Sequence, residues 1–362
     1  MYTRMRMTIV MAVAASLVGC GGTGLMEGAP DMAVGADMAV GADLATTPGP
    51  DMAQQSTQCL PAGGPTRAQY VWNDLILPMQ RSDYGFDLNG DGRVDNQLGN
   101  IEGALAGQML PTQDEATQAV TSGQSLTLVD ERADDLANDD CAATDLEAAT
   151  VMASPDFSGA GHFTVDTSVA PAAHLAGPIL AGKFSSEPWP AYATTPVTVT
   201  LNLPLLGAVT TISVVGVHVQ YTRGPDGKLT GGQLNGAIKN ADVQAKLIPN
   251  VANALTTKIM TDMNAGGLTA TDMQILSIFD NGGKADAACP AGTCKNPAGT
   301  CAVKGDNKID ICEVSTAGLI QNVLAPDVQM FDASGNYHPN PDNTMKDSLS
   351  IGLAFTAVPA TF

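Results

Sequence analysis

The chain has 362 residues, of which 37 are aspartate or glutamate and 17 are lysine or arginine, so its formal net charge is −20. This balance argues against nucleic acids and anionic lipid headgroups as partners, because their phosphates would be repelled. Aromatic residues make up only 4% of the chain. The acidic excess is suited to cation binding and to solubility in an extracytoplasmic space.

The first twenty residues have the order of a bacterial export signal. Arg4 and Arg6 form a short positive segment, and the apolar stretch after them is too short to span a bilayer as a mature helix. Residues 17–20 (Leu-Val-Gly-Cys) resemble the lipobox of bacterial lipoproteins. This resemblance implies that residues 1–19 are removed as a signal peptide and that Cys20 is acylated, for example with palmitate, so that lipid holds the protein on a membrane. An ordinary signal peptide that contains a cysteine is the alternative.

Residues 20–57 form a tether of low complexity. Aspartate-methionine-alanine or aspartate-leucine-alanine triplets begin at Asp31, Asp37, Asp43 and Asp51. Such a segment has no apolar face large enough to offset chain entropy, so we expect it to be disordered and to hold a domain clear of the membrane. A methionine-based copper site is a less favoured interpretation. Glycine follows the lipidated cysteine, whereas aspartate there would retain a lipoprotein in the inner membrane, so the outer membrane is favoured.

Residues 58–362 are long enough for one large extracytoplasmic domain, or for two smaller domains that share an interface. The first half of this region predicts two short helices and a central group of strands. In chain order we expect a strand at 70–78, a helix with apolar residues from 98 to 109, a helix that begins with the capping-box pattern at Thr112, strands at 197–203 and 211–222, a hairpin turn at 224–227 and a strand at 228–238.

The second half of the domain predicts three helices and a C-terminal strand. We expect a helix over 243–263 with Asn240 as its N-cap and a kink at Pro249, a helix at 269–279, a helix at 315–324, and a strand whose apolar residues alternate from 349 to 355. The predicted class is therefore α+β, with a largely antiparallel sheet, several short helices and a disulfide-stapled loop near the C-terminus.

Six cysteines remain after the lipidated one, which in an oxidising compartment indicates up to three disulfides. Four of them crowd between residues 289 and 312, so local bridges are expected there, and the other two are then the natural long-range pair. The six are Cys59, Cys141, Cys289, Cys294, Cys301 and Cys312. A zinc site is the rival interpretation for the crowded four, although they lack the tightly paired spacing of zinc ribbons.

The segment from Asp87 to Asp95 predicts a calcium loop. Calcium prefers about 6 to 8 oxygen ligands, and oxygens at loop positions 1, 3 and 5 converge when glycine at position 6 turns the chain sharply. Asp87, Asn89 and Asp91 fill those positions, the Arg93 carbonyl is the ligand expected at position 7, and Asp95 stands at position 9. The loop runs over 87–98, but position 12 is leucine and not the glutamate of an EF-hand. The segment therefore looks closer to the short EF-hand-like loops of dockerins and thrombospondin type 3 repeats, and a turn without an ion is the alternative.

A second, weaker metal candidate lies among the crowded cysteines. Aligned as a loop, the segment 302–313 places Asp306 at position 5, Asp310 at position 9 and Glu313 at position 12. Positions 1 and 3 hold alanine and lysine, which supply no side-chain carboxylate. We expect a structural role here more than ion binding.

The order of these features is similar to a group of uncharacterised lipoproteins from myxobacteria. The similarity consists of the lipobox, the repeated tether, the calcium loop with its continuation at 95–99 (Asp-Asn-Gln-Leu-Gly), Cys-Glu-Val at 312–314, Leu-Ala-Pro-Asp at 324–327 and the alternating C-terminal strand. It covers most of the mature chain. The resemblance implies a place in the cell envelope and calcium binding, and it implies no activity.

The sequence contains no Gly-x-Ser-x-Gly, His-Glu-x-x-His or Ser-x-x-Lys motif and no phosphate loop. His218 is expected to be a packed side chain on the same strand face as Ile212 and Val214. We therefore expect a non-enzymatic lipoprotein with a calcium-stabilised binding or structural domain, whose protein or glycan partner no motif specifies. The alternatives are a secreted hydrolase that uses carboxylates, and a carrier with a long apolar cavity beneath its sheet.

Overall fold

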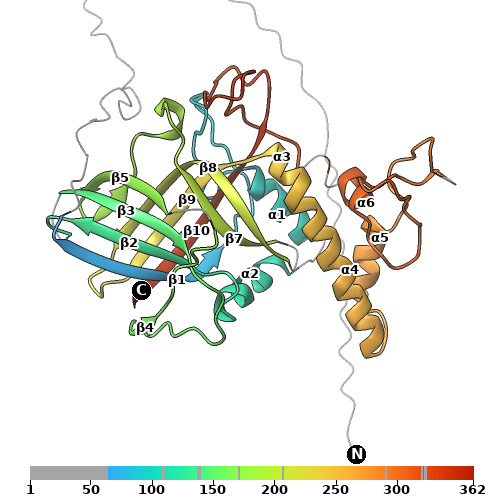
Figure 1. Cartoon of the computed structure of the whole chain (residues 1–362), viewed down its shortest axis with the longest axis horizontal. Helices are drawn as coiled ribbons and strands as arrows, with labels where there is room; N and C mark the ends of the chain where they lie inside the picture. Colours follow the sequence, from blue (N-terminus) through green and yellow to red (C-terminus); the bar gives the residue numbers. More distant parts are fainter. Residues whose placement is uncertain are drawn as a thin grey trace, which may run out of the picture. The chain divides into compact units, whose positions relative to one another are not determined.

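An antiparallel sheet that closes on itself forms the centre of the structure (Figure 1). The computed structural model describes residues 64–362 apart from 108–110, 137–139, 170–171, 206–207, 290–291, 319–320 and 322–323. The expectations for Cys20, for the tether and for Cys59 lie outside these residues. By its internal contacts the chain divides into residues 1–52 and 53–362, and the second unit holds every described helix and strand.

Eight strands make up the closed sheet, and every pairing between neighbours in the ring is antiparallel. In ring order they are β1 (Thr66–Ile76), β2 (Thr127–Ala133), β3 (Asp140–Ala148), β5 (Ala173–Leu180), β6 (Lys183–Ser185), β8 (Ala208–Arg223), β9 (Leu229–Lys239) and β10 (Ser348–Thr361), and β10 pairs with β1 again. Strand β7 (Thr198–Leu205) pairs with the first half of β8, and the short β4 (Gly161–His162) lies parallel to the end of β10.

Most helices lie to one side of the sheet in Figure 1. They are α1 (Gln97–Gly107), α2 (Thr112–Thr121), the 3-10 turn η2 (Pro190–Tyr192), α3 (Asn240–Asp242), the π-turn η3 (Val243–Leu247), α4 (Ile248–Ala265), α5 (Ala270–Phe279) and α6 (Ile311–Thr316). Helix α1 packs on β10, α2 on β1 and β7, and α4 on β8 and α6. Within the described ranges, no helix is both long and apolar enough to cross a membrane. The predicted α+β class, with a mostly antiparallel sheet and short helices, is thus confirmed.

Several helices begin at residues other than those predicted from the sequence. Asn240 is not an N-cap, because the helix starts at this residue. Pro249 lies inside one continuous run of helical residues from Asn240 to Ala265, and the helix widens to a π-turn over 243–247 directly before it. Helix α6 begins at Ile311, earlier than predicted, because Asp310 and Glu313 form a capping box. The capping box predicted at Thr112 is wrong, because the helix already starts at this residue and Pro111, its N-cap, makes no side-chain cap; Thr269 and Asp272 do form a capping box at the start of α5.

The alternating apolar side chains of β10 point into the ring, as the sequence predicts. Leu349, Ile351, Leu353 and Phe355 are all at most 1% exposed and belong to the main hydrophobic core. The Phe355 ring stacks on Trp72 of β1, with ring centroids 4.2 Å apart. The strand that closes the ring is therefore joined to its neighbour both by backbone hydrogen bonds and by aromatic packing.

A β-bulge in the middle of β8 changes which face of the sheet its later side chains occupy. Ile212 and Val214 join the main core, but the register with β9 shifts between Val215 and His218. Consequently His218 lies on the opposite face, stacked on Phe86 with centroids 4.3 Å apart. The prediction that His218 shares a face with Ile212 and Val214 was wrong, because one extra residue in a strand changes which face every later side chain occupies. The prediction that it is packed is confirmed, since it is 1% exposed.

Candidate metal centre

The loop at 87–95 gathers three carboxylates. Oxygens of Asp87, Asp91 and Asp95 all lie within 4.8 Å of one another. Both glycines of the loop have positive φ (81° at Gly90 and 77° at Gly92), which allows the sharp turn that the motif predicts. The structure thus brings the predicted side chains at positions 1, 5 and 9 together.

Backbone N–H groups hold the loop in shape around Asp87. The Gly90 and Gly92 amides donate to its two carboxylate oxygens at 2.7 and 2.8 Å, and the Asp91 amide donates at 3.1 Å. Asn89 is 1% exposed, and its Oδ1 accepts from the Asp91 amide at 3.2 Å. The Arg93 amide in turn donates to Asp91 Oδ1 at 2.8 Å. These hydrogen bonds fix the orientation of the Asp87, Asn89 and Asp91 side chains.

Asp95 is the buried member of the group. It is 0% exposed, its Oδ2 accepts from the Leu88 amide at 3.1 Å, and its Oδ1 lies 3.2 Å from the Arg81 guanidinium. Burial raises the pKa of Asp95 to about 7; the Leu88 amide opposes the rise and the charges of Asp327 and Asp91 add to it. A cation at this place would favour the ionised carboxylate.

The residues on either side anchor the loop to the outer face of β10. The Asn96 side chain bonds both backbone groups of Gly352, donating to its carbonyl and accepting from its amide at 2.9 Å each. A side chain at Gly352 would meet the Tyr84 carbonyl at 2.3 Å, so the close approach requires glycine. Ser350 is fully buried on the same face of β10, and its hydroxyl donates to Asp327 at 2.6 Å. The polar face of β10 is therefore covered and not solvated.

Arg81 and Asp327 complete the surroundings of the site, although sequence reasoning assigned neither to it. Arg81 lies between two buried carboxylates, 3.2 Å from Asp95 and 3.5 Å from Asp327. Asp327 comes from the Leu-Ala-Pro-Asp segment at 324–327, which entered the sequence analysis only as part of the resemblance. Position 12 of the loop, Leu98, is 2% exposed and belongs to the core instead of to a ligand set.

Apolar contacts hold the same loop on β8 and β9. Leu88 is 0% exposed and packs in a small cluster with Val215 and Ala237 from the sheet and with Val328 and Met330 from the segment before β10. Because these contacts join segments that are distant in sequence, any ion that stabilises the loop stabilises the outer layer of the fold.

In the weaker candidate at 302–313 the acidic side chains hold the backbone. The Glu313 carboxylate accepts from the amides of Gly282 at 2.8 Å and Asp310 at 3.0 Å, so it caps the start of α6. Burial of this carboxyl group is the main reason that its pKa is raised to about 7. Asp306 accepts from the Lys308 amide. Among the described residues, only Asp87, Asp91 and Asp95 bring three possible metal-ligand side chains within 4.8 Å of one another.

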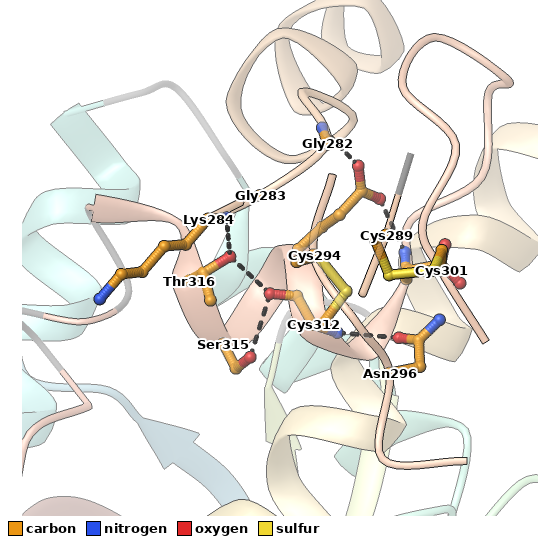
Figure 2. The surroundings of a disulfide bond; sticks show 12 residues. Gly282, Gly283, Lys284, Cys289, Cys294, Asn296, Cys301, Cys312, Ser315 and Thr316 are labelled. Atoms are coloured by element: carbon orange, nitrogen blue, oxygen red, sulfur yellow. Dashed lines mark hydrogen bonds between the residues drawn. A yellow bond between two sulfur atoms is a disulfide. The ribbon is translucent and has the colours of Figure 1, made fainter. Parts of the chain in front are cut away.

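Two disulfides staple this C-terminal segment, as predicted (Figure 2). Cys289 is bonded to Cys301, and the buried Cys294 is bonded to Cys312. The four sulfurs are thus paired with one another and do not form a zinc site. Cys141 is also disulfide-bonded, and the partner proposed for it from the sequence lies outside the described residues.

Comparisons with known proteins add no family to this description. No protein-family model matches the chain, and the searches of curated proteins and of solved structures found no match.

Proposed function

We propose that this chain is a lipid-anchored extracytoplasmic protein whose folded domain is stabilised by calcium and has a binding or structural role. The observation that carries the proposal is the convergence of Asp87, Asp91 and Asp95 within 4.8 Å on a loop with the calcium-type spacing. All the side chains concerned offer oxygen, which suits a hard cation such as Ca²⁺. Three carboxylates this close repel one another without a cation.

The cavity beneath the sheet gives little support to the alternative role as a carrier of apolar ligands. It lies between α1, α4 and β10 and has a volume of about 30 Å³. That volume holds one or two water molecules, whereas ligand sites usually have about 300 Å³ or more. A larger pocket of about 340 Å³ lies between α2, α4 and α5, and polar and apolar side chains line it together.

Calcium is expected to raise the melting temperature of the protein. If binding is confined to the folded state, calcium at about 100 times its dissociation constant adds roughly 2.7 kcal/mol to the free energy of unfolding. Thermal unfolding in EDTA and in calcium measures this shift. Asp91→Asn is expected to lose most of it, because the amide keeps an oxygen that accepts from the Arg93 amide but removes the charge. Asp91→Ala removes the ligand altogether.

Asp332→Asn is the matched control for this experiment. Asp332 also accepts backbone amides in an exposed turn, from Ser334 at 2.8 Å and Asn336 at 2.9 Å, and lies outside the carboxylate group. This variant is expected to keep the full calcium response. An equal response in wild type and Asp91→Asn, or none in wild type, would contradict calcium binding at the loop.

The anchor is tested separately from the calcium site. In a bacterial host, the wild-type protein is expected in the membrane fraction, and Cys20→Ser is expected to leave it, because the substituted residue accepts no lipid. Extraction of the wild type by detergent but not by high salt would distinguish a lipid anchor from electrostatic attachment. Equal membrane retention of both proteins would overturn the lipidation proposal and leave the calcium proposal standing.

A further inference from the structure

A buried carboxyl group on α1 has no role in the carboxylate loop. Glu102 is 0% exposed and lies on the face of the helix that carries Ile101 and Leu105 into the core. Neither of its carboxyl oxygens has a hydrogen bond of ordinary geometry among the described residues, although the Thr112 hydroxyl of α2 favours its ionised form. Burying an ionised carboxylate without partners is costly, whereas a neutral carboxyl costs much less. The packing of α1 therefore depends on the protonation state of one side chain.

The groups around Glu102 are apolar on nearly every side. The cavity next to it has only apolar accessible surface, and its walls include Leu203 of β7, Ile238 of β9, Leu247 of η3, Val251 of α4, Val314 of α6 and Ile351 of β10. The acidic Glu115 of α2 disfavours the ionised form of Glu102. The Thr112 hydroxyl favours the ionised form, but burial opposes that form more strongly. In the described ranges no lysine or arginine faces this carboxyl.

We infer that Glu102 is a pH-sensitive switch that holds α1 against the sheet when protonated and releases the helix when ionised. Helix α1 follows the 87–95 loop directly and contacts β10, so its release would loosen the layer over the strand that closes the ring. The inference concerns helix packing and does not depend on calcium binding.

The direction of the effect follows from linkage. Burial raises the pKa of Glu102 from 4.5 to about 7 while α1 is packed against the sheet. A group whose pKa is raised in the packed state stabilises that state most at low pH, and this stabilisation is lost as the pH rises from about 4.5 to about 7. With an ordinary pKa in the open state, the opening equilibrium of α1 increases about 20-fold between pH 5.5 and pH 7.5.

Hydrogen exchange of the intact protein in calcium-free buffer tests this inference. Mass spectrometry compares peptides of α1 with those of α5, which corrects for the intrinsic pH dependence of exchange. Helix α5 is a suitable reference because the pKa of Asp272 is about 2, so this carboxylate stays ionised throughout. We expect α1 in the wild type to lose about 20-fold of its protection relative to α5 between pH 5.5 and pH 7.5. Glu102→Gln, which has the same shape and does not titrate, is expected to show no such loss.

Unchanged protection of α1 in the wild type, or an equal loss in Glu102→Gln, would overturn the inference. A carbon-13 NMR titration of the Glu102 carboxyl in the wild type needs no variant and covers the case in which Glu102→Gln does not fold. Titration near neutral pH supports the switch, and titration at the ordinary glutamate value rejects it.

Discussion

Replacing Glu131 with alanine is expected to lower the free energy of unfolding by about 3 kcal/mol, because it leaves a partly buried arginine without its counter-charge. Glu131 is 1% exposed inside the closed sheet, where it forms a hydrogen-bonded ion pair with Arg223 of β8. The same guanidinium donates to the Tyr70 hydroxyl of β1 at 3.0 Å. Three strands that are distant in sequence therefore share one polar contact. Urea unfolding followed by fluorescence and circular dichroism measures the loss.

A double variant separates the ion pair from its desolvation. Glu131→Leu combined with Arg223→Met removes both charges and keeps apolar volume, so its stability is expected to be much closer to wild type than that of either single change. The exposed pair of Lys228 and Asp226 is the control, and breaking it is expected to cost less than about 1 kcal/mol. A loss below about 1 kcal/mol in Glu131→Ala would show that the interior pair does not hold the ring together.

Phe355→Ala is expected to destabilise the protein by about 3–5 kcal/mol through the cavity that it opens in the ring. Phe355 is 1% exposed and stacks on Trp72. A β-carbon on Gly232 would lie 2.5 Å from the Phe355 ring, so the neighbouring strand has no side chain with which to fill the space. Phe355→Leu retains part of the volume and is expected to cost less. The midpoint of urea unfolding measures both variants.

Phe331→Ala provides the comparison for that cavity. Phe331 is only partly buried, and it meets Tyr337 edge-on with centroids 5.9 Å apart, outside the ring. Its removal is expected to cost clearly less than the removal of Phe355, because solvent can fill the space at this partly exposed position. Equal losses for the two phenylalanines would contradict the larger cavity cost that we expect for Phe355 inside the ring.

Local interactions allowed several features to be predicted from the sequence alone. The alternation in β10 requires only that one strand face be apolar, and the helix predicted at 269–279 depends on the local pattern of its own ten or so residues. Cys289 and Cys301 pair across a separation of 12 residues, so proximity in sequence was enough to expect local bridges. The turn around Asp87 follows in the same way from the spacing of glycines and carboxylates within one short loop.

Four strands of the ring, β2, β3, β5 and β6, were not predicted because their signal is weak. Strand β2 reads Thr-Leu-Val-Asp-Glu-Arg-Ala, and charges stand on both of its faces. Asp130 is paired with Arg67 at 2.7 Å on one face, while Glu131 meets Arg223 on the other. These charges are tolerated only because partners arrive from strands far away in the chain, which a local pattern does not contain.

The order and spacing of residues in the sequence were enough to predict the carboxylate loop, the local disulfides and the C-terminal strand. Tertiary structure alone decided that this strand closes a ring, that a bulge turns His218 outward, and that Arg81 and Asp327 surround Asp95. It also decided that Glu102, on an otherwise ordinary amphipathic helix, is buried with no basic side chain to offset its charge in the part of the chain that the structure describes. The physical reason is range: turns and periodic faces depend on neighbours in sequence, whereas closure, burial and charge pairing depend on which distant segments meet.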